Sequence, residues 1–392
     1  MKESCWRGGA GPEILLKLAL GALLALAVLC AAAAAAFGET DIGELDELLE
    51  QSGVNEAAER LSPATRELMR ELGIEEISPG ALMALSPKSF LRLTARLAAD
   101  RLLRPLKNSA AICAAALLCA AAENMKLRAD EKTVGGVVSV VGSLCCCAAV
   151  AVPAGDIIER VGEAVGECAD FLLSFVPVYA GIAASGGKPA AAAAYNAALF
   201  GVAQASGRLA SDVIEPLAGI FLALALVGAA APSFGLTELA GSIKKTVNWA
   251  LGLISTVFVG ALGLQSAVGA SSDGVTMKAA RFAVSSTVPV VGGALAEAMS
   301  SAAGYLGLLK NVTGAFGIAA GAAIFLPIVV ELALWRFGLG IAAVFAETAG
   351  ASGISRASRA AGDVLEMLLA LTLSLLLIMI VATGILLAAG TA

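Results

Sequence analysis

Long apolar stretches separated by short charged segments make up most of this chain. A helix needs about 20 such residues to cross the roughly 30 Å of hydrocarbon in a bilayer. Stretches of that kind occur at roughly 106–122, 134–153, 213–231, 247–270, 312–335 and 364–389. Three further stretches, 171–185, 190–206 and 282–308, fit short spans, broken helices or re-entrant hairpins. The pattern predicts an all-α, polytopic membrane protein with six to nine spans in a membrane domain over residues 106–392.

The first 36 residues carry the pattern of a signal peptide or signal anchor. Lys2, Arg7 and Lys17 lead into an apolar run, and the alanines at 31–36 offer a small-residue cleavage site. A signal peptide places the next segment outside the cytoplasm. The alternative is an uncleaved first span.

Residues 37–105 form an acidic segment that we expect to be exported and helical. Its three Ser-Pro pairs, at 62–63, 78–79 and 86–87, each match a helix N-cap followed by proline at the first helical position. The last helix, from Pro87, places Phe90, Leu91 and Leu93 largely on one face, with arginines around the remainder. Such a basic amphipathic helix lies on lipid headgroups or forms the solvated face of a small bundle.

Charges in the next loops favour the same orientation. Lys126, Arg128 and Lys132 crowd the loop after the first span, whereas 154–170 contains one arginine among five acids. Because positive loops stay in the cytoplasm, 123–133 is predicted inside and 154–170 outside.

One motif, Ser-x-Val-Pro-Val-x-x-Gly, occurs twice within apolar sequence. Its first copy contains Ser174, Pro177 and Gly181, and its second contains Ser286, Pro289 and Gly293. Proline removes a backbone donor and bends or breaks a membrane helix. Each copy follows an apolar run and a polar stretch with an aspartate, Asp156 or Asp273, and each is followed by a further proline, Pro216 or Pro327. We therefore predict two repeat halves, about 134–231 and 247–345, whose breaks line a conduit or are packed kinks.

Composition supports the membrane assignment and limits the chemistry. Hydrophobic residues make up 58% of the chain and charged residues 15%, and 43 glycines suit close helix packing in lipid. The chain has no histidine, the usual general base and commonest metal ligand. The eight cysteines form no Cys-x-x-Cys pair, and the net charge of −6 gives no sign of nucleic-acid binding. We expect no catalytic residues, no cofactor and no metal.

Several local patterns resemble functional motifs. Gly350-Ala-Ser352-Gly353 has the string of an intramembrane serine protease but lacks the histidine base, so we interpret it as a turn. Ionisable residues within spans are functional candidates by default. Glu331 is such a candidate, and the alternative is an intrahelical pair with Arg336. Glu297 is expected at a wet hairpin tip, and Gly317-x-x-x-Gly321 and Gly162-x-x-x-Gly166 are expected to serve packing.

The chain resembles the stage III sporulation protein AE family. The resemblance rests on the order of signal, acidic segment and membrane domain, and on the stretches Phe171–Pro177, Ser271–Val275, Lys278–Phe282, Val288–Leu295 and Leu309–Asn311. It implies a part in the channel assembled between mother cell and forespore, in the mother-cell membrane around the forespore. The implied partners are ring-forming membrane proteins and a secretion-type ATPase.

Two functional hypotheses follow. The first is a non-enzymatic membrane component of this sporulation complex, with the motif copies near a conduit or partner interface. The second is a self-sufficient secondary transporter, which should show several polar or charged groups near the membrane midplane. The sequence offers only Glu331, Glu297 and serines for that role, which favours the first hypothesis.

Overall fold

A computed structural model describes residues 49, 52–74, 77–78, 81, 87–126, 132–186, 189–209, 212, 215–230, 239–261, 263–264 and 292–388. The expected signal segment and three candidate residues, Asp273, Ser286 and Pro289, lie outside these residues. The helices are α3 (Val54–Glu59), α4 (Pro63–Glu71), α6 (Pro87–Lys126), α7 (Lys132–Ser185), α8 (Pro189–Leu209), α9 (Glu215–Ala230), α11 (Gly292–Thr348) and α12 (Ser352–Ala388). Residues 239–261 are also helical, and the described part contains no strand. The all-α prediction is confirmed.

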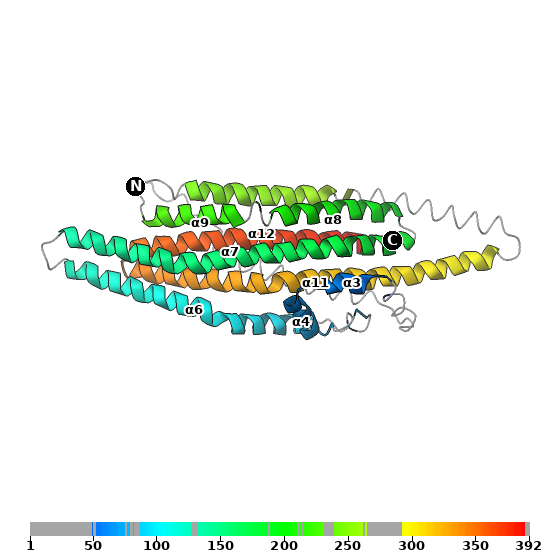
Figure 1. The fold of residues 1–392 in the computed structure, drawn as a ribbon, viewed down its shortest axis with the longest axis horizontal. Helices are drawn as coiled ribbons and strands as arrows, with labels where there is room; N and C mark the ends of the chain where they lie inside the picture. Colours follow the sequence, from blue (N-terminus) through cyan, green and yellow to red (C-terminus); the bar gives the residue numbers. More distant parts are fainter. Residues whose placement is uncertain are drawn as a thin grey trace, which may run out of the picture.

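The long helices form an elongated bundle (Figure 1). α7 has 54 residues and α11 has 57, so each is about 80 Å long at 1.5 Å per residue. α8 and α9 follow one another along the bundle, whereas α6 lies on the other side of α7 (Figure 1). Four stretches are long and apolar enough to cross a membrane: Lys88–Ala121, Leu144–Ser185, Gly304–Thr348 and Ser352–Gly384. The chain is thus built as a multi-pass membrane protein.

One predicted loop is wrong, and one predicted domain boundary falls inside a helix. Residues 154–170, expected to be an external loop, lie in the middle of α7. Residue 105, where the exported segment was expected to end, lies inside α6, which continues through Pro105 to Lys126, so the division between that segment and the membrane domain stays a prediction. In both places the charged residues are spread over helix faces that contact neighbouring helices or remain exposed, so the charges do not interrupt the backbone.

The proline motif does not break its helix. α7 is continuous through Pro153 and Pro177, and Pro177 lies on an exposed face of this helix. The break predicted at Pro177 is therefore wrong. The following prolines also differ, because Pro216 is in the first turn of α9 whereas Pro327 is inside α11. The repeat over 134–231 and 247–345 stays a prediction, since Pro289 lies outside the described residues.

The core lies where α7, α11 and α12 meet. Phe171, Phe175 and Tyr179 stack along one side of α7, with ring centroids 5.1 and 5.5 Å apart. Gly317 of α11 makes room for this stack, because an added Cβ would lie 2.5 Å from the Phe175 ring. At Gly321 an added Cβ would collide with the end of the Met379 side chain. Packing is thus confirmed as the role of this glycine pair, whereas the space beside Gly166 is open.

The segment before α6 packs against the long helices. Ser62 is the N-cap of α4, and its Oγ accepts a hydrogen bond from the Thr65 amide at 3.1 Å. This confirms the Ser-Pro interpretation at 62–63, and α6 begins at Pro87 as predicted. Phe90 and Leu93 of α6 are buried, but Leu91 is 70% exposed and does not share their face.

Candidate functional site: interhelical ion pairs

A buried carboxylate joins three of the long helices. Glu331 of α11 accepts hydrogen bonds from Arg101 of α6 at 2.7 Å and from Arg160 of α7 at 2.6 Å, one at each carboxylate oxygen. The Glu331 side chain is 9% exposed, and the two arginines are 38% and 35% exposed. Arg101 also lies 3.5 Å from the carbonyl of Pro327. Because the buried charge is paired on both sides, it is compatible with an apolar surrounding.

The pair predicted between Glu331 and Arg336 does not form. Five residues apart on a helix, the two side chains point away from each other, since neighbours on one face are three or four residues apart. Arg336 instead lies 3.6 Å from Glu366 of α12. Sequence reasoning therefore identified the charged position but assigned it the wrong partner.

A second network ties residues 239–261 to α11 and α12. Lys244 lies 2.8 Å from Asp363 and 3.0 Å from Glu366, and Glu366 also pairs with Arg336. The guanidinium of Arg336 runs over Gly362, where an added Cβ would lie 3.2 Å from it. A larger residue at that position would push the guanidinium away from Glu366.

The two networks lie at one level of the bundle. Glu331 and Arg336 are about 7.5 Å apart along α11 at 1.5 Å per residue, and each is the α11 member of one network. We call the seven residues of both networks the ion-pair layer: Arg101, Arg160, Lys244, Glu331, Arg336, Asp363 and Glu366. It connects α6, α7, α11, α12 and the helix at 239–261, so its chemistry is that of a clamp between helices.

Uncharged helix continues from this layer toward the α7–α8 turn. On α11, residues 311–330 contain no charged residue, which corresponds to about 30 Å. On α12 the uncharged stretch is 367–388. The ion-pair layer therefore ends an uncharged stretch of α11 and α12 whose length matches the hydrocarbon thickness of a bilayer, whereas α7 carries Glu163, Glu167 and Asp170 beside that stretch.

The candidate residues of the first motif copy point away from the core. Pro177 and Gly181 are exposed, and an added Cβ at Gly181 would meet nothing within 4 Å. The Ser174 hydroxyl donates to the carbonyl of Asp170 at 3.3 Å, a contact within the helix. The intervening residues Phe175 and Tyr179 make the tertiary contacts instead, with Phe316 of α11 and Tyr195 of α8. Pro177 and Gly181 therefore lie on an outer surface of α7, whereas Val176 of the same motif is fully buried.

The remaining candidates give no active site among the described residues. Gly293 and Glu297 lie in the first turns of α11. Gly350 has a left-handed conformation with φ of 88° in the turn between α11 and α12, which confirms the turn predicted there. In the part of the chain that is described, no group of three His, Cys, Asp or Glu side chains is placed to bind a metal ion.

Comparison with known proteins identifies the family. The model of the family described as stage III sporulation protein AE matches residues 73–390. A protein of Bacillus subtilis (strain 168) named stage III sporulation protein AE is 28% identical over 162 residues, which make up 41% of this chain and 41% of that protein. None of the solved structures matches the chain. Because the family model covers α6 to α12 and with them the whole ion-pair layer, the chain belongs to the stage III sporulation protein AE family.

Proposed function

We propose that this chain is a non-enzymatic membrane component of a channel complex that links the mother cell and the forespore during sporulation. The family match over residues 73–390 carries the proposal, because it ties the chain to the third stage of sporulation. The helices long enough to span a membrane are consistent with a place in the mother-cell membrane. We further propose that residues 37–105 lie outside the cytoplasm.

The charges of the described helices support a structural part in a complex. In a self-sufficient transporter, polar groups near the midplane remain available to bind substrate and coupling ion. Here Glu331 and Glu366 each pair with two cations on neighbouring helices. Charges that are already paired favour a clamp between helices over a substrate site.

The partners in this proposal are ring-forming membrane proteins and a secretion-type ATPase. Such an enzyme would supply nucleotide hydrolysis, for which we found no phosphate-binding motif in the chain.

The test is a deletion of the encoding gene in its own organism, complemented by the wild-type chain. A reporter of late forespore gene expression should stay silent after engulfment in the deletion strain and return on complementation. Normal reporter output without the chain would exclude the proposed role. A purified chain that alone carries out solute uptake in liposomes would favour a transporter instead.

A further inference from the structure

Two opposite sides of α7 differ in polarity at the same level of the bundle. The start of α3 lies against α7, since a Cβ added to its N-cap Gly53 would be 3.8 Å from the Val178 side chain. α8 lies against α7 where Tyr195 packs edge-on to Tyr179, with ring centroids 5.3 Å apart. Since Val178 and Tyr179 are adjacent, α3 and α8 flank α7 at one level, on either side of it (Figure 1).

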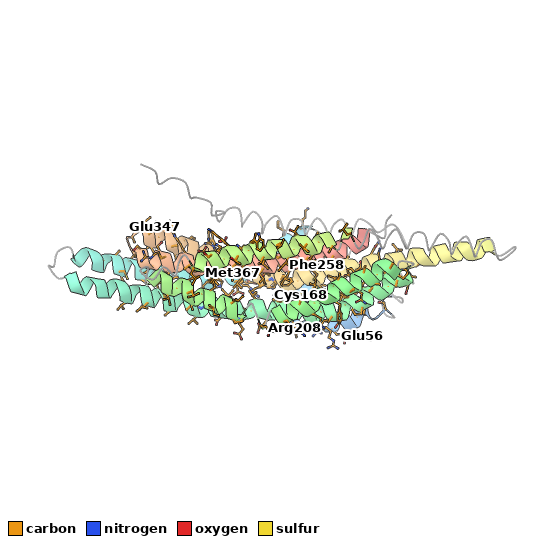
Figure 2. All side chains as sticks on the ribbon, turned by 90° about the horizontal axis from the view of Figure 1, so that it is seen from above. Glu56, Cys168, Arg208, Phe258, Glu347 and Met367 are labelled. Atoms are coloured by element: carbon orange, nitrogen blue, oxygen red, sulfur yellow. The ribbon has the colours of Figure 1, made fainter. Side chains whose placement is uncertain are left out.

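The α3 side is charged. α3, α4 and the turn between them bury Val54, Ala57, Leu61 and Met69 and expose Glu56, Glu59, Arg60, Arg66, Glu67 and Arg70. Figure 2 shows Glu56 directed away from the bundle. We call this exposed surface the charged side.

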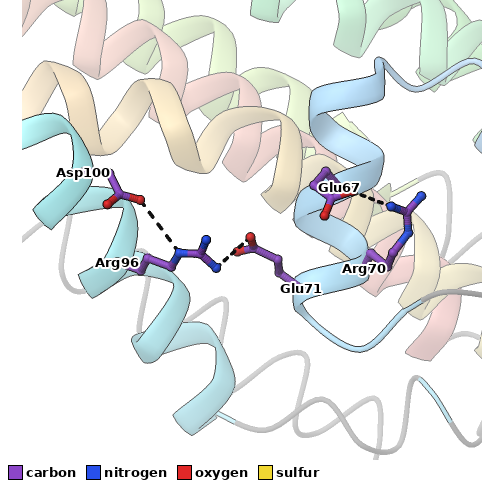
Figure 3. A network of polar contacts seen from close by, with 5 residues as sticks. All are labelled: Glu67, Arg70, Glu71, Arg96 and Asp100. Atoms are coloured by element: carbon purple, nitrogen blue, oxygen red, sulfur yellow. Dashed lines mark hydrogen bonds and ion pairs between the residues drawn. The ribbon is translucent and has the colours of Figure 1, made fainter.

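Specific contacts hold the charged side in place. The Ser62 amide donates to the Glu167 carboxylate of α7 at 2.9 Å. Arg96 of α6 bridges Glu71 of α4 at 2.8 Å and Asp100 at 3.8 Å (Figure 3). α3 and α4 are therefore fixed parts of the bundle surface.

The α8 side is apolar. From 189 to 207 α8 contains no charged residue, and Ala193, Ala197 and Phe200 are exposed. The neighbouring helix at 239–261 exposes Leu253, Ile254 and Val257 beyond its basic start. Large apolar side chains exposed in this way are typical of a surface that faces lipid.

The level shared by α3 and α8 lies within the membrane-length zone. Val178 is in the uncharged end of α7, residues 171–185, and at this level α11 is also uncharged, since Phe316 packs against Phe175 within the stretch 311–330. Placing six charged side chains in hydrocarbon would cost about 15 kcal/mol or more, at about 2.5–3.5 kcal/mol each. That exceeds the net stability of most domains, so lipid cannot cover the charged side.

We propose that the chain meets lipid through α8 and residues 239–261, and water through α3 and α4, as one wall segment of a water-filled passage. This inference rests on the proposed role in a channel complex, and it assigns α3 and α4 to the aqueous wall. It does not involve the proline motif, whose first copy has Pro177 and Gly181 on the exposed surface of α7.

The test is the reactivity of single cysteines in the full chain, in membranes of sporulating cells. The native cysteines are first replaced by serine or alanine, and Glu56→Cys and Arg66→Cys on the charged side are compared with Ala197→Cys and Val257→Cys on the apolar side. The probe is a small, positively charged methanethiosulfonate that does not cross membranes, applied to both membrane faces. Labelling after denaturation confirms that each thiol is present and reactive.

Glu56→Cys and Arg66→Cys should react at least tenfold faster than Ala197→Cys and Val257→Cys. Similar, fast reaction at all four sites would overturn the proposal, because the bilayer would then surround another part, such as the apolar hairpin of α6 and α7. Slow reaction at Glu56→Cys and Arg66→Cys would also overturn it, because no water would reach the charged side. The forespore reporter in the same strains separates this result from the proposed function, which stands or falls with the deletion strain.

Discussion

Replacing Glu331 by glutamine should destabilise the protein more than any exposed charge change on the same helix. The substitution keeps the size of the side chain but removes the charge that pairs with Arg101 and Arg160 at 2.7 and 2.6 Å. Breaking a fully buried pair costs about 3–5 kcal/mol, whereas an exposed pair contributes about 1 kcal/mol or less. Because the carboxylate is buried but both arginines are about one-third exposed, we expect a loss of about 2 kcal/mol in the free energy of unfolding.

The matched control is Glu347→Gln, which makes the same change on α11. Glu347 pairs with Arg359, and both side chains are more than half exposed, so its loss should be below about 1 kcal/mol. The assay is thermal unfolding of the purified chain in detergent, followed by tryptophan fluorescence. Glu331→Gln should lower the midpoint by about 4–8 °C, by the scaling for domains of 150–250 residues, and Glu347→Gln by much less.

A double variant separates the ion pair from a change in packing. After Glu331→Gln the two guanidinium groups lose the anion between them, so removing one of them relieves their repulsion. Glu331→Gln combined with Arg160→Gln should therefore cost less than the sum of the two single changes. Equal midpoints for Glu331→Gln and Glu347→Gln, or strict additivity in the double variant, would refute the reasoning.

Three further predictions concern packing and backbone. Gly317→Ala should lower the thermal midpoint, because its Cβ would lie 2.5 Å from the Phe175 ring, at a cost of about 1–3 kcal/mol. The control Gly307→Ala, whose Cβ would meet nothing within 4 Å, should raise the midpoint, and the opposite order of the two midpoints would contradict the described packing. Ser62→Ala removes the N-cap of α4 and should cost about 1 kcal/mol, seen as faster tryptic cleavage within α4, and unchanged cleavage would argue against the cap. Pro177→Ala should raise the midpoint, because it restores a helical hydrogen bond at an exposed position, and leave forespore reporter output normal; loss of output at normal protein levels would return a functional role to this motif.

We predicted the helices from the lengths of the apolar stretches, and this prediction is confirmed where one apolar stretch corresponds to one helix. The stretches 213–231 and 364–389 correspond to α9 (Glu215–Ala230) and α12 (Ser352–Ala388). It failed for α7, where Asp156 to Asp170 suggested a loop. A charged segment that ends a helix cannot be told from sequence from one whose side chains contact neighbouring helices while its own helix continues. Only tertiary contacts, such as that of Arg160 with Glu331, distinguish the two cases.

The site was predicted only in part for the same reason. Glu331 was found because a lone acid in an apolar run is conspicuous. Its partners come from positions 171 and 230 residues away in sequence, and no local pattern links them. Arg101 was assigned to an amphipathic surface helix, and Arg160 was counted only as a minority charge in a supposed loop. The pairing depends on α6 and α7 both lying beside α11, which spacing along one helix cannot reveal.

The most direct test of the central claim is to isolate the chain from cells undergoing engulfment and quantify what purifies with it. A tagged chain, extracted in mild detergent and analysed by mass spectrometry, should bring down other membrane proteins of the same sporulation stage together with a secretion-type ATPase. The same amounts should be recovered from the Glu347→Gln strain. Recovery of the wild-type chain alone, at normal abundance and from intact membranes, would contradict its proposed place in a channel complex.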